Sequence, residues 1–89
     1  MRQSQITIVN RLGLHARAAA KFVTLASRFE SEVQLVRDGQ PVNGKSIMGV
    51  MMLAACRGTT LELVANGVDE VQAVEELAAL VAARFGESE

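Results

Sequence analysis

The segment Gly13-Leu14-His15-Ala16-Arg17 places an imidazole two residues before a guanidinium. Imidazole is the side chain that is partly uncharged near neutral pH, and its free lone pair can attack a phosphoryl donor. A guanidinium forks onto phosphate oxygens with two parallel hydrogen bonds. This pair therefore indicates transient phosphorylation of His15, with Arg17 holding the phosphoryl oxygens.

The helix predicted over residues 16–29 begins in an unusual way. Serine, threonine, aspartate or asparagine normally caps a helix, but His15 stands in that place. The first turn normally favours an acid, whereas Arg17 lies there and Lys21 follows one turn later. A bound anion would relieve this excess of positive charge, so we expect the phosphoryl group to lie over the backbone N–H groups of Ala16 and Arg17. Gly13 would allow a sharp turn and the close approach of a partner.

Other interpretations of this segment stay open. A lone histidine at a helix start is commonly solvated, and the basic helix start could belong to a non-catalytic module that binds phosphate or an acidic peptide. A small RNA-binding domain is disfavoured by the net charge of −1 and by the absence of Trp and Tyr. Covalent labelling with phosphate would separate a carrier from a binding module.

Composition limits the class of protein. With 89 residues and 9.5 kDa, we expect one small domain over residues 1–89, and 49% hydrophobic residues argue against disorder. The single cysteine and single histidine exclude a disulfide framework and a metal site built from several of these residues, so no metal or cofactor is expected. The longest apolar run, residues 47–56, is shorter than the roughly 20 residues that span a bilayer. Without a signal-like N-terminal segment, a cytoplasmic protein with no membrane contact is expected.

Charge is distributed unevenly along the chain. All five charged residues of segment 1–29 are basic, whereas residues 30–89 carry four bases and ten acids. The N-terminal third should therefore attract anions. A basic region this small suits a phosphate or an acidic protein surface better than nucleic acid.

Hydrophobic periodicity predicts four strands and three helices. The strands are expected at 4–9, 32–37, 40–43 and 59–65, and the helices at 16–29, about 47–54 and from Asp69 to Gly86. Asp38-Gly39 predicts a hairpin and Pro41 an edge strand. Ser46 is expected to cap the second helix, and Asp69 with Gln72 to form a capping box on the third. The apolar stripes of the two longer helices are Ala18, Phe22, Leu25, Ala26 and Phe29, and Val71, Val74, Ala78, Val81 and Phe85.

The order β-α-β-β-α-β-α favours an α+β fold in which helices cover one face of an antiparallel sheet. Two motifs also carry a family resemblance. Residues 13–17 resemble the active-site signature of HPr, the histidine-containing phosphocarrier of the bacterial phosphoenolpyruvate-dependent phosphotransferase system. Residues 44–51, Gly-Lys-Ser-Ile-Met-Gly-Val-Met, resemble the second HPr signature, and Gly58, the strand after it and the last helix also align. The resemblance covers essentially the whole chain.

The resemblance implies an open-faced β-sandwich of four antiparallel strands with three helices on one side. It implies that His15 accepts a phosphoryl group on Nδ1 from enzyme I and donates it to enzyme II A domains, with Arg17 stabilising the phosphate. Such a protein is a covalent carrier rather than an enzyme, and it is expected to be a monomer. The family usually has proline where this chain has Ala18. A loosened helix start is the expected effect, although alanine is an excellent helix former.

The resemblance also implies regulation and docking. Ser46 would be phosphorylated by an HPr kinase, which adds about two negative charges beside the docking face. The docking residues would be Ala20, Lys21, Thr24, Ile47, Met48 and Met51.

The remaining residues suggest structural roles. Met52 is expected in the core, Cys56 as a small packed hydrophobe, and the acidic residues Asp69, Glu70, Glu75 and Glu76 as a solvated face. The motif around Ser46 favours HPr over its nitrogen-related paralogue, but sugar uptake and a regulatory branch both stay open.

Overall fold

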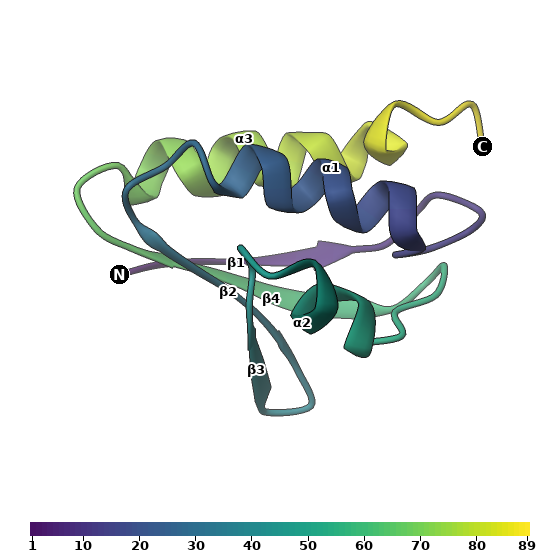
Figure 1. Ribbon diagram of the computed structural model, residues 1–89, viewed down its shortest axis with the longest axis horizontal. Helices are drawn as coiled ribbons and strands as arrows, with labels where there is room; N and C mark the ends of the chain where they lie inside the picture. Colours follow the sequence, from purple (N-terminus) through teal and green to yellow (C-terminus); the bar gives the residue numbers. More distant parts are fainter.

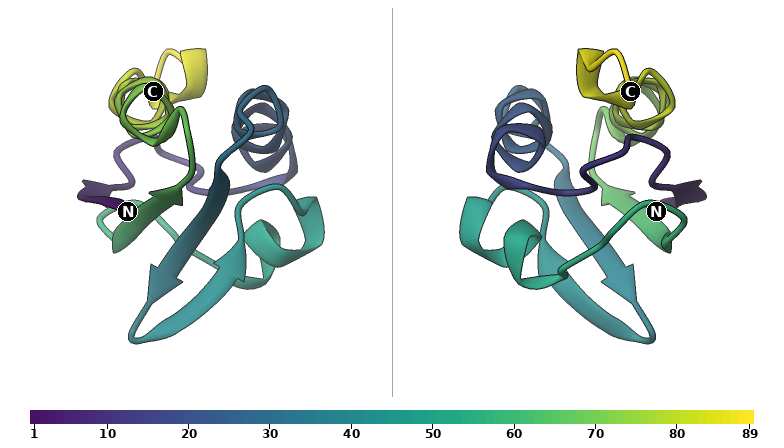
Figure 2. Two further views of the ribbon diagram at one scale, coloured as in Figure 1. Left: turned by 90° about the vertical axis from the view of Figure 1, so that its left-hand side faces the viewer. Right: turned by 90° about the vertical axis from the view of Figure 1, so that its right-hand side faces the viewer.

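The computed structural model describes residues 1–89, with the element order β-α-β-β-α-β-α followed by a short 3₁₀ turn. Four strands, β1 (Arg2–Thr7), β2 (Glu32–Arg37), β3 (Gln40–Asn43) and β4 (Thr60–Asn66), form one antiparallel sheet in the order β1-β4-β2-β3. The helices are α1 (Ala16–Ala26), α2 (Ile47–Met52) and α3 (Glu70–Ala82), and the turn is η1 (Arg84–Gly86). Figure 1 and the end-on views of Figure 2 show α1 and α3 side by side over one face of the sheet. The predicted open four-stranded sheet with three helices is confirmed.

A single apolar core lies between the sheet and the helices. The alternating strand residues Val33, Leu35, Leu61, Leu63 and Ala65 point into it, as the period of two predicts. Phe22 of α1 and Leu77 of α3 meet these side chains and are completely buried. The strand residues between the buried ones face outward and are mostly polar, so the sheet has one bare face. This packing fixes the positions of the helix ends that carry the site.

The hairpin and the edge strand agree with the sequence prediction. Asp38 and Gly39 both have positive φ angles of 51° and 80°, the combination that a tight two-residue hairpin turn requires. β3 pairs only with β2, so Pro41 lies in an edge strand, where its missing N–H is tolerated. Ile6 and Ile8 are both buried as predicted, although β1 lies two residues earlier than the predicted range of 4–9.

The first two helices are shorter than predicted. α1 ends at Ala26 rather than residue 29, because the N–H groups of Arg28 and Phe29 bond to carbonyls three residues back in a tightened last turn. Phe29 is nevertheless buried and Leu25 is half-buried. α2 ends at Met52 instead of about residue 54.

The last predicted helix differs in both its start and its end. Asp69 makes no capping bond to α3, so the predicted capping box is wrong. Its carboxylate instead accepts hydrogen bonds from the backbone N–H of Glu30 and of Ser31, each at 3.0 Å, and from the Ser31 hydroxyl. Glu70 accepts from Gly67 N at 3.2 Å. The backbone just before β2 therefore binds the Asp69 carboxylate, which was expected to cap α3.

The break after α3 has a direct bearing on the site. The helix ends at Ala82, and Arg84 and Phe85 take φ angles of 59° and 54°. This turn buries the Phe85 ring completely, as the apolar stripe predicts. Burial of the ring offsets the strained backbone. The C-terminal segment after this turn lies at the same end of the molecule as the start of α1, as Figure 1 shows. Val71, by contrast, was predicted in the stripe but is exposed.

Candidate functional site

His15 occupies the N-cap position of α1 without capping it. Its backbone is extended, with φ −74° and ψ 176°, and its side chain makes no capping hydrogen bond. The first N–H bonded along the helix is that of Ala19, which donates to the His15 carbonyl at 2.8 Å. The N–H groups of Ala16, Arg17 and Ala18 have no protein acceptor, and no acid lies in the first turn. The positive end of α1 is therefore open to an anion, as predicted.

Gly13 positions the histidine against the loop that follows α2. Its φ of +68° is in the left-handed region, and a Cβ here would lie 2.5 Å from the Ala55 carbonyl oxygen. The next residue, Leu14, donates its N–H to the same oxygen at 2.9 Å and buries its side chain. The predicted sharp turn is present, and it holds the backbone on the N-terminal side of His15 against the body of the protein.

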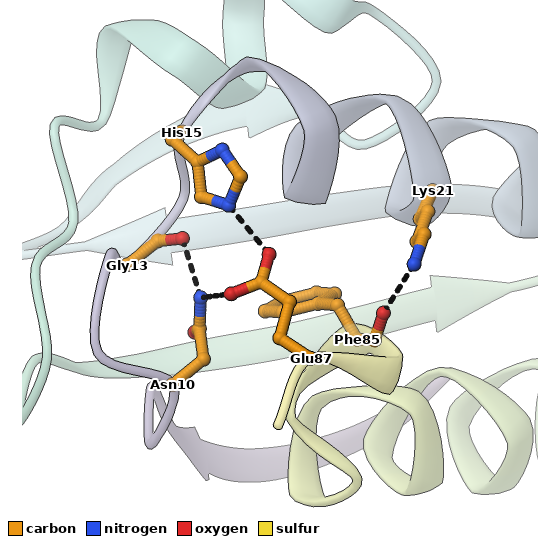
Figure 3. A network of polar contacts seen from close by, with 6 residues as sticks. All are labelled: Asn10, Gly13, His15, Lys21, Phe85 and Glu87. Carbon is orange, nitrogen blue, oxygen red and sulfur yellow. Dashed lines mark hydrogen bonds and ion pairs between the residues drawn. The ribbon is translucent and has the colours of Figure 1, made fainter. Parts of the chain in front are cut away.

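The His15 ring is paired with a carboxylate from the other end of the chain. Glu87 Oε2 lies 2.5 Å from His15 Nε2, and the two side chains are 18% and 29% exposed. Figure 3 shows this contact and shows the other ring nitrogen, Nδ1, turned away from Glu87. Hydrogen bonds from Asn10 first, and then from His15, hold the pKa of Glu87 below its usual range. Glu87 is thus ionised at neutral pH.

Asn10 links the His15 loop to Glu87. Its side chain is completely buried, and Nδ2 donates to the Gly13 carbonyl at 2.8 Å and to Glu87 Oε1 at 3.0 Å (Figure 3). Its oxygen Oδ1 is buried without a protein donor. Both acceptors fix the orientation of the amide, since only its nitrogen can donate. One buried side chain thus holds the turn before His15 and the carboxylate beside it.

Further contacts hold the C-terminal segment in place. Lys21 Nζ donates to the Phe85 carbonyl at 2.7 Å (Figure 3). The Arg11 guanidinium lies 3.2 Å from a Glu89 carboxylate oxygen, and the Arg11 N–H donates to the Glu89 backbone oxygen. Glu87 N donates to the Arg84 carbonyl at 2.9 Å. Residues 84–89 are therefore fixed on both sides of Glu87.

Arg17 has a free guanidinium beside this network. It is exposed and makes no hydrogen bond or ion pair within the chain. With His15, Arg11 and Glu87 it lines a shallow hollow. The structure thus brings His15, Arg17 and the open N–H groups of α1 together, which is the arrangement the sequence predicted.

Apolar side chains are exposed on α2 next to α1. Met48 is 75% exposed, Ile47 and Met51 are also exposed, and α1 and α2 pack together. Thr24 is exposed and Ala20 half-buried on α1, whereas the ammonium of Lys21 is engaged by Phe85. The residues predicted to bind partners are Ala20, Lys21, Thr24, Ile47, Met48 and Met51, and we refer to this predicted set as the docking surface. Met52 is 78% exposed, so its predicted core position is wrong; α2 is only six residues long and buries Val50 alone.

Several other predicted positions are resolved by the structure. Ser46 caps α2 as predicted, with Oγ accepting from Gly49 N at 3.1 Å. Cys56 is exposed rather than packed, because it lies in the turn before β4. Glu75 and Glu76 are solvated as expected, but Asp69 and Glu70 are half-buried, since each accepts backbone hydrogen bonds.

The sequence did not indicate Asn10 or Glu87 as site residues. Asn10 looked like an ordinary turn residue, and Glu87 lies 72 positions from His15. Their contact depends on the break at Arg84 and Phe85, which helical periodicity predicts to be continuous helix. Only the acidic character of the C-terminal end, opposite a basic N-terminal third, gave a weak signal.

The described side chains form no cluster of three or more His, Cys, Asp or Glu residues that could hold a metal ion. None of the helices has the length and apolar character needed to cross a bilayer.

Comparisons with known proteins agree with the geometry. The family model described as "PTS HPr component phosphorylation site" matches residues 2–83. The chain is 55% identical to the phosphocarrier protein HPr of Cupriavidus necator over 89 residues, covering all of both chains, and 52% identical to that of Neisseria meningitidis, also over the full length of both. The crystal structure of HPr-C-His from Thermoanaerobacter tengcongensis superposes with a TM-score of 0.96 at 44% identity, again covering both chains completely. The chain therefore belongs to the HPr family of phosphocarrier proteins.

Proposed function

We propose that this phosphocarrier relays a phosphoryl group through a phosphohistidine at His15. The Nδ1 lone pair attacks the phosphorus of phosphorylated enzyme I, whose phosphate comes from phosphoenolpyruvate. The new N–P bond forms as the bond to the donor breaks, and the donor keeps that electron pair. In the second step a nucleophile of an enzyme II A domain attacks the phosphorus, and the N–P electron pair returns to Nδ1. The protein is regenerated, so it acts as a covalent carrier.

The observation that carries this proposal is the open, positively charged start of α1 at His15. Three N–H groups there lack acceptors, and the guanidinium of Arg17 has no partner in the chain. Phosphoryl oxygens on Nδ1 would meet the N–H groups of Ala16 and Arg17, and Arg17 would bind two oxygens at once. These donors need no reorganisation, which favours a group that must be taken up and released repeatedly.

The docking surface is proposed as the contact for both partners. Flexible thioether side chains adapt to differently shaped partners, and Met48 and Met51 are exposed on this surface. The positive charges of α1 would attract acidic partner faces. Because enzyme I and enzyme II A domains would bind the same surface, they would bind one after the other. The carrier would act as a monomer in the cytoplasm.

Ser46 is proposed as a regulatory phosphorylation site for an HPr kinase. A phosphate on its Oγ would add about two negative charges beside Ile47 and Met48. This charge would weaken the docking of acidic partners. Incubation with an HPr kinase and ATP, followed by mass spectrometry, tests the site; absence of phosphate on Ser46 would refute this part of the proposal.

The decisive experiment uses phosphoenolpyruvate and enzyme I. We expect acid-labile, alkali-stable phosphate on the protein, none on His15→Ala, and slower labelling of Arg17→Ala by about tenfold or more, the effect of losing one charge-assisted phosphate contact. A module that only binds phosphate or acidic peptides would acquire no covalent label. Transfer from the labelled protein to purified sugar-specific or nitrogen-related enzyme II A domains then distinguishes sugar uptake from a regulatory branch.

A further inference from the structure

We propose that Glu87 is a positioning residue that fixes the proton of His15 on Nε2 and so keeps the Nδ1 lone pair available to the phosphoryl donor. This inference rests on the proposed function, in which Nδ1 is the nucleophile. A neutral imidazole carries one proton, and the partner of one nitrogen decides which nitrogen holds it. A carboxylate can only accept, so Glu87 at 2.5 Å from Nε2 selects the tautomer protonated there.

The carboxylate is held in place by groups that do not involve His15. Its other oxygen accepts from buried Asn10, whose second bond to the Gly13 carbonyl prevents the amide from turning. The backbone on either side is fixed by the Lys21 bond to Phe85 and by the Arg11 pair with Glu89. Glu87 is therefore held in a fixed position next to the imidazole by the surrounding structure.

Glu87 does not block the anion site. Figure 3 shows it on the Nε2 side of the ring, while Nδ1 faces away from it. When Nδ1 attacks phosphorus, the N–P bond forms, the donor keeps its bonding pair, and the proton stays on Nε2. The phosphorylated ring then carries a positive charge next to the Glu87 carboxylate, which stabilises it. No proton moves in either direction of transfer.

The buried amide of Asn10 makes one substitution especially informative. In Glu87→Gln, the new amide oxygen must face Asn10 Nδ2, because the opposite orientation would bring two donors together at a distance of 3.0 Å. The new NH₂ group then faces His15 Nε2 and donates to it. The ring proton moves to Nδ1, and the nucleophilic lone pair is lost. The same carboxylate-to-amide change in the Ser-His-Asp triad leaves the geometry intact and selects the wrong tautomer.

The first measurement is direct and needs no partner. In ¹⁵N-labelled protein at a pH where His15 is neutral, long-range ¹H–¹⁵N correlation spectra report which ring nitrogen carries the proton. We expect Nε2–H in the unmodified protein, Nδ1–H in Glu87→Gln, and a mixture in Glu87→Ala, which leaves Nε2 unpaired. Glu75→Gln is the matched control, since Glu75 is exposed on α3 and contacts neither His15 nor the C-terminal segment; it should keep Nε2–H.

The second measurement is the rate of labelling by phosphoenolpyruvate and enzyme I. We expect Glu87→Gln to be slower than Glu87→Ala, and at least about tenfold slower than Glu75→Gln, as for the loss of one charge-assisted hydrogen bond. A purely structural role predicts the reverse order, because glutamine keeps the shape. An unmodified protein with Nδ1–H, or equal rates for Glu87→Gln and Glu75→Gln, would overturn the inference. If the unmodified protein takes up no phosphate at all, the proposed function fails instead.

Discussion

Lys21 and the carbonyl of Phe85 are joined by a 2.7 Å hydrogen bond that ties the middle of α1 to the turn after α3. Lys21 therefore holds the C-terminal segment as well as lying on the docking surface. Part of any effect of its removal on phosphoryl transfer would come through Glu87, two residues beyond Phe85.

Lys21→Met should loosen residues 84–89 without unfolding the domain, because it removes the partly buried hydrogen bond to the Phe85 carbonyl and keeps an aliphatic side chain. We expect the Glu87 amide, which donates to Arg84, to exchange its hydrogen about tenfold faster, as for one lost bond of this kind. Lys45→Met is a matched control, since Lys45 Nζ also donates to a backbone carbonyl at 2.7 Å, that of Phe29. Equal exchange at Glu87 in both variants would contradict the tether.

Gly13→Ala should destabilise the protein by about 3 kcal/mol, the sum of a left-handed backbone penalty of about 1–2 kcal/mol and an overpacking penalty of about 1–3 kcal/mol. The new Cβ would lie 2.5 Å from the Ala55 oxygen. Gly39 has φ +80° but no atom within 4 Å of an added Cβ, so Gly39→Ala should cost only about 1 kcal/mol. Urea unfolding of both variants checks the difference, and similar losses would show that the contact with Ala55 is unimportant.

Met48→Asp should slow transfer from enzyme I and to enzyme II A domains by about tenfold, because it places a charge in an apolar contact. Since Met48 is 75% exposed, the thermal midpoint should hardly change. Val68→Asp introduces the same charge at an apolar residue that is 84% exposed in the loop between β4 and α3. Unchanged kinetics for Met48→Asp with both partners would remove Met48 from the docking surface.

Asp69 should make stability depend on pH in the acid range. The hydrogen bond from the Ser31 hydroxyl, and then that from Glu30 N, lower the pKa of Asp69 below its ordinary 3.8. A depressed folded-state pKa gives stabilisation that is present above about 3.8 and is lost as the pH falls below it. The thermal midpoint of the unmodified protein should therefore fall more steeply below pH 3.8 than that of Asp69→Asn.

Parallel slopes for the two proteins would show that Asp69 does not couple folding to protonation. Glu75→Gln provides the control, because Glu75 is exposed and lies on the solvated face of α3. Its acid-range slope should match that of the unmodified protein.

The parts of the fold that depend on local pattern were predictable. Val33 and Leu35 both point into the core, and Ser46 caps α2. The start of α1 has no side-chain cap, as expected with histidine in the N-cap position. Competition between distant groups was not predictable. Asp69 was expected to cap α3, but the N–H groups of Glu30 and Ser31 bind it instead.

The same limit explains why half of the site was missed. The Glu87 contact requires the chain to leave its helical course at Arg84 and Phe85, where positive φ angles are unfavourable locally and are offset only by burial of Phe85 in the finished core. Met52 was misplaced because a six-residue helix has room for few buried side chains, and Cys56 because it lies beyond that helix, in the turn before β4.

Asn10 makes the heat resistance of this small domain depend on the same side chain that arranges its histidine. Its carboxamide is wholly enclosed, and its nitrogen donates to both the Gly13 carbonyl and Glu87. A leucine here would leave both acceptors without that donor and would enlarge a completely buried side chain, so it should be destabilising. A screen for thermal tolerance alone would therefore keep asparagine at this position and, with it, both the turn that carries the histidine and the acid that orients it.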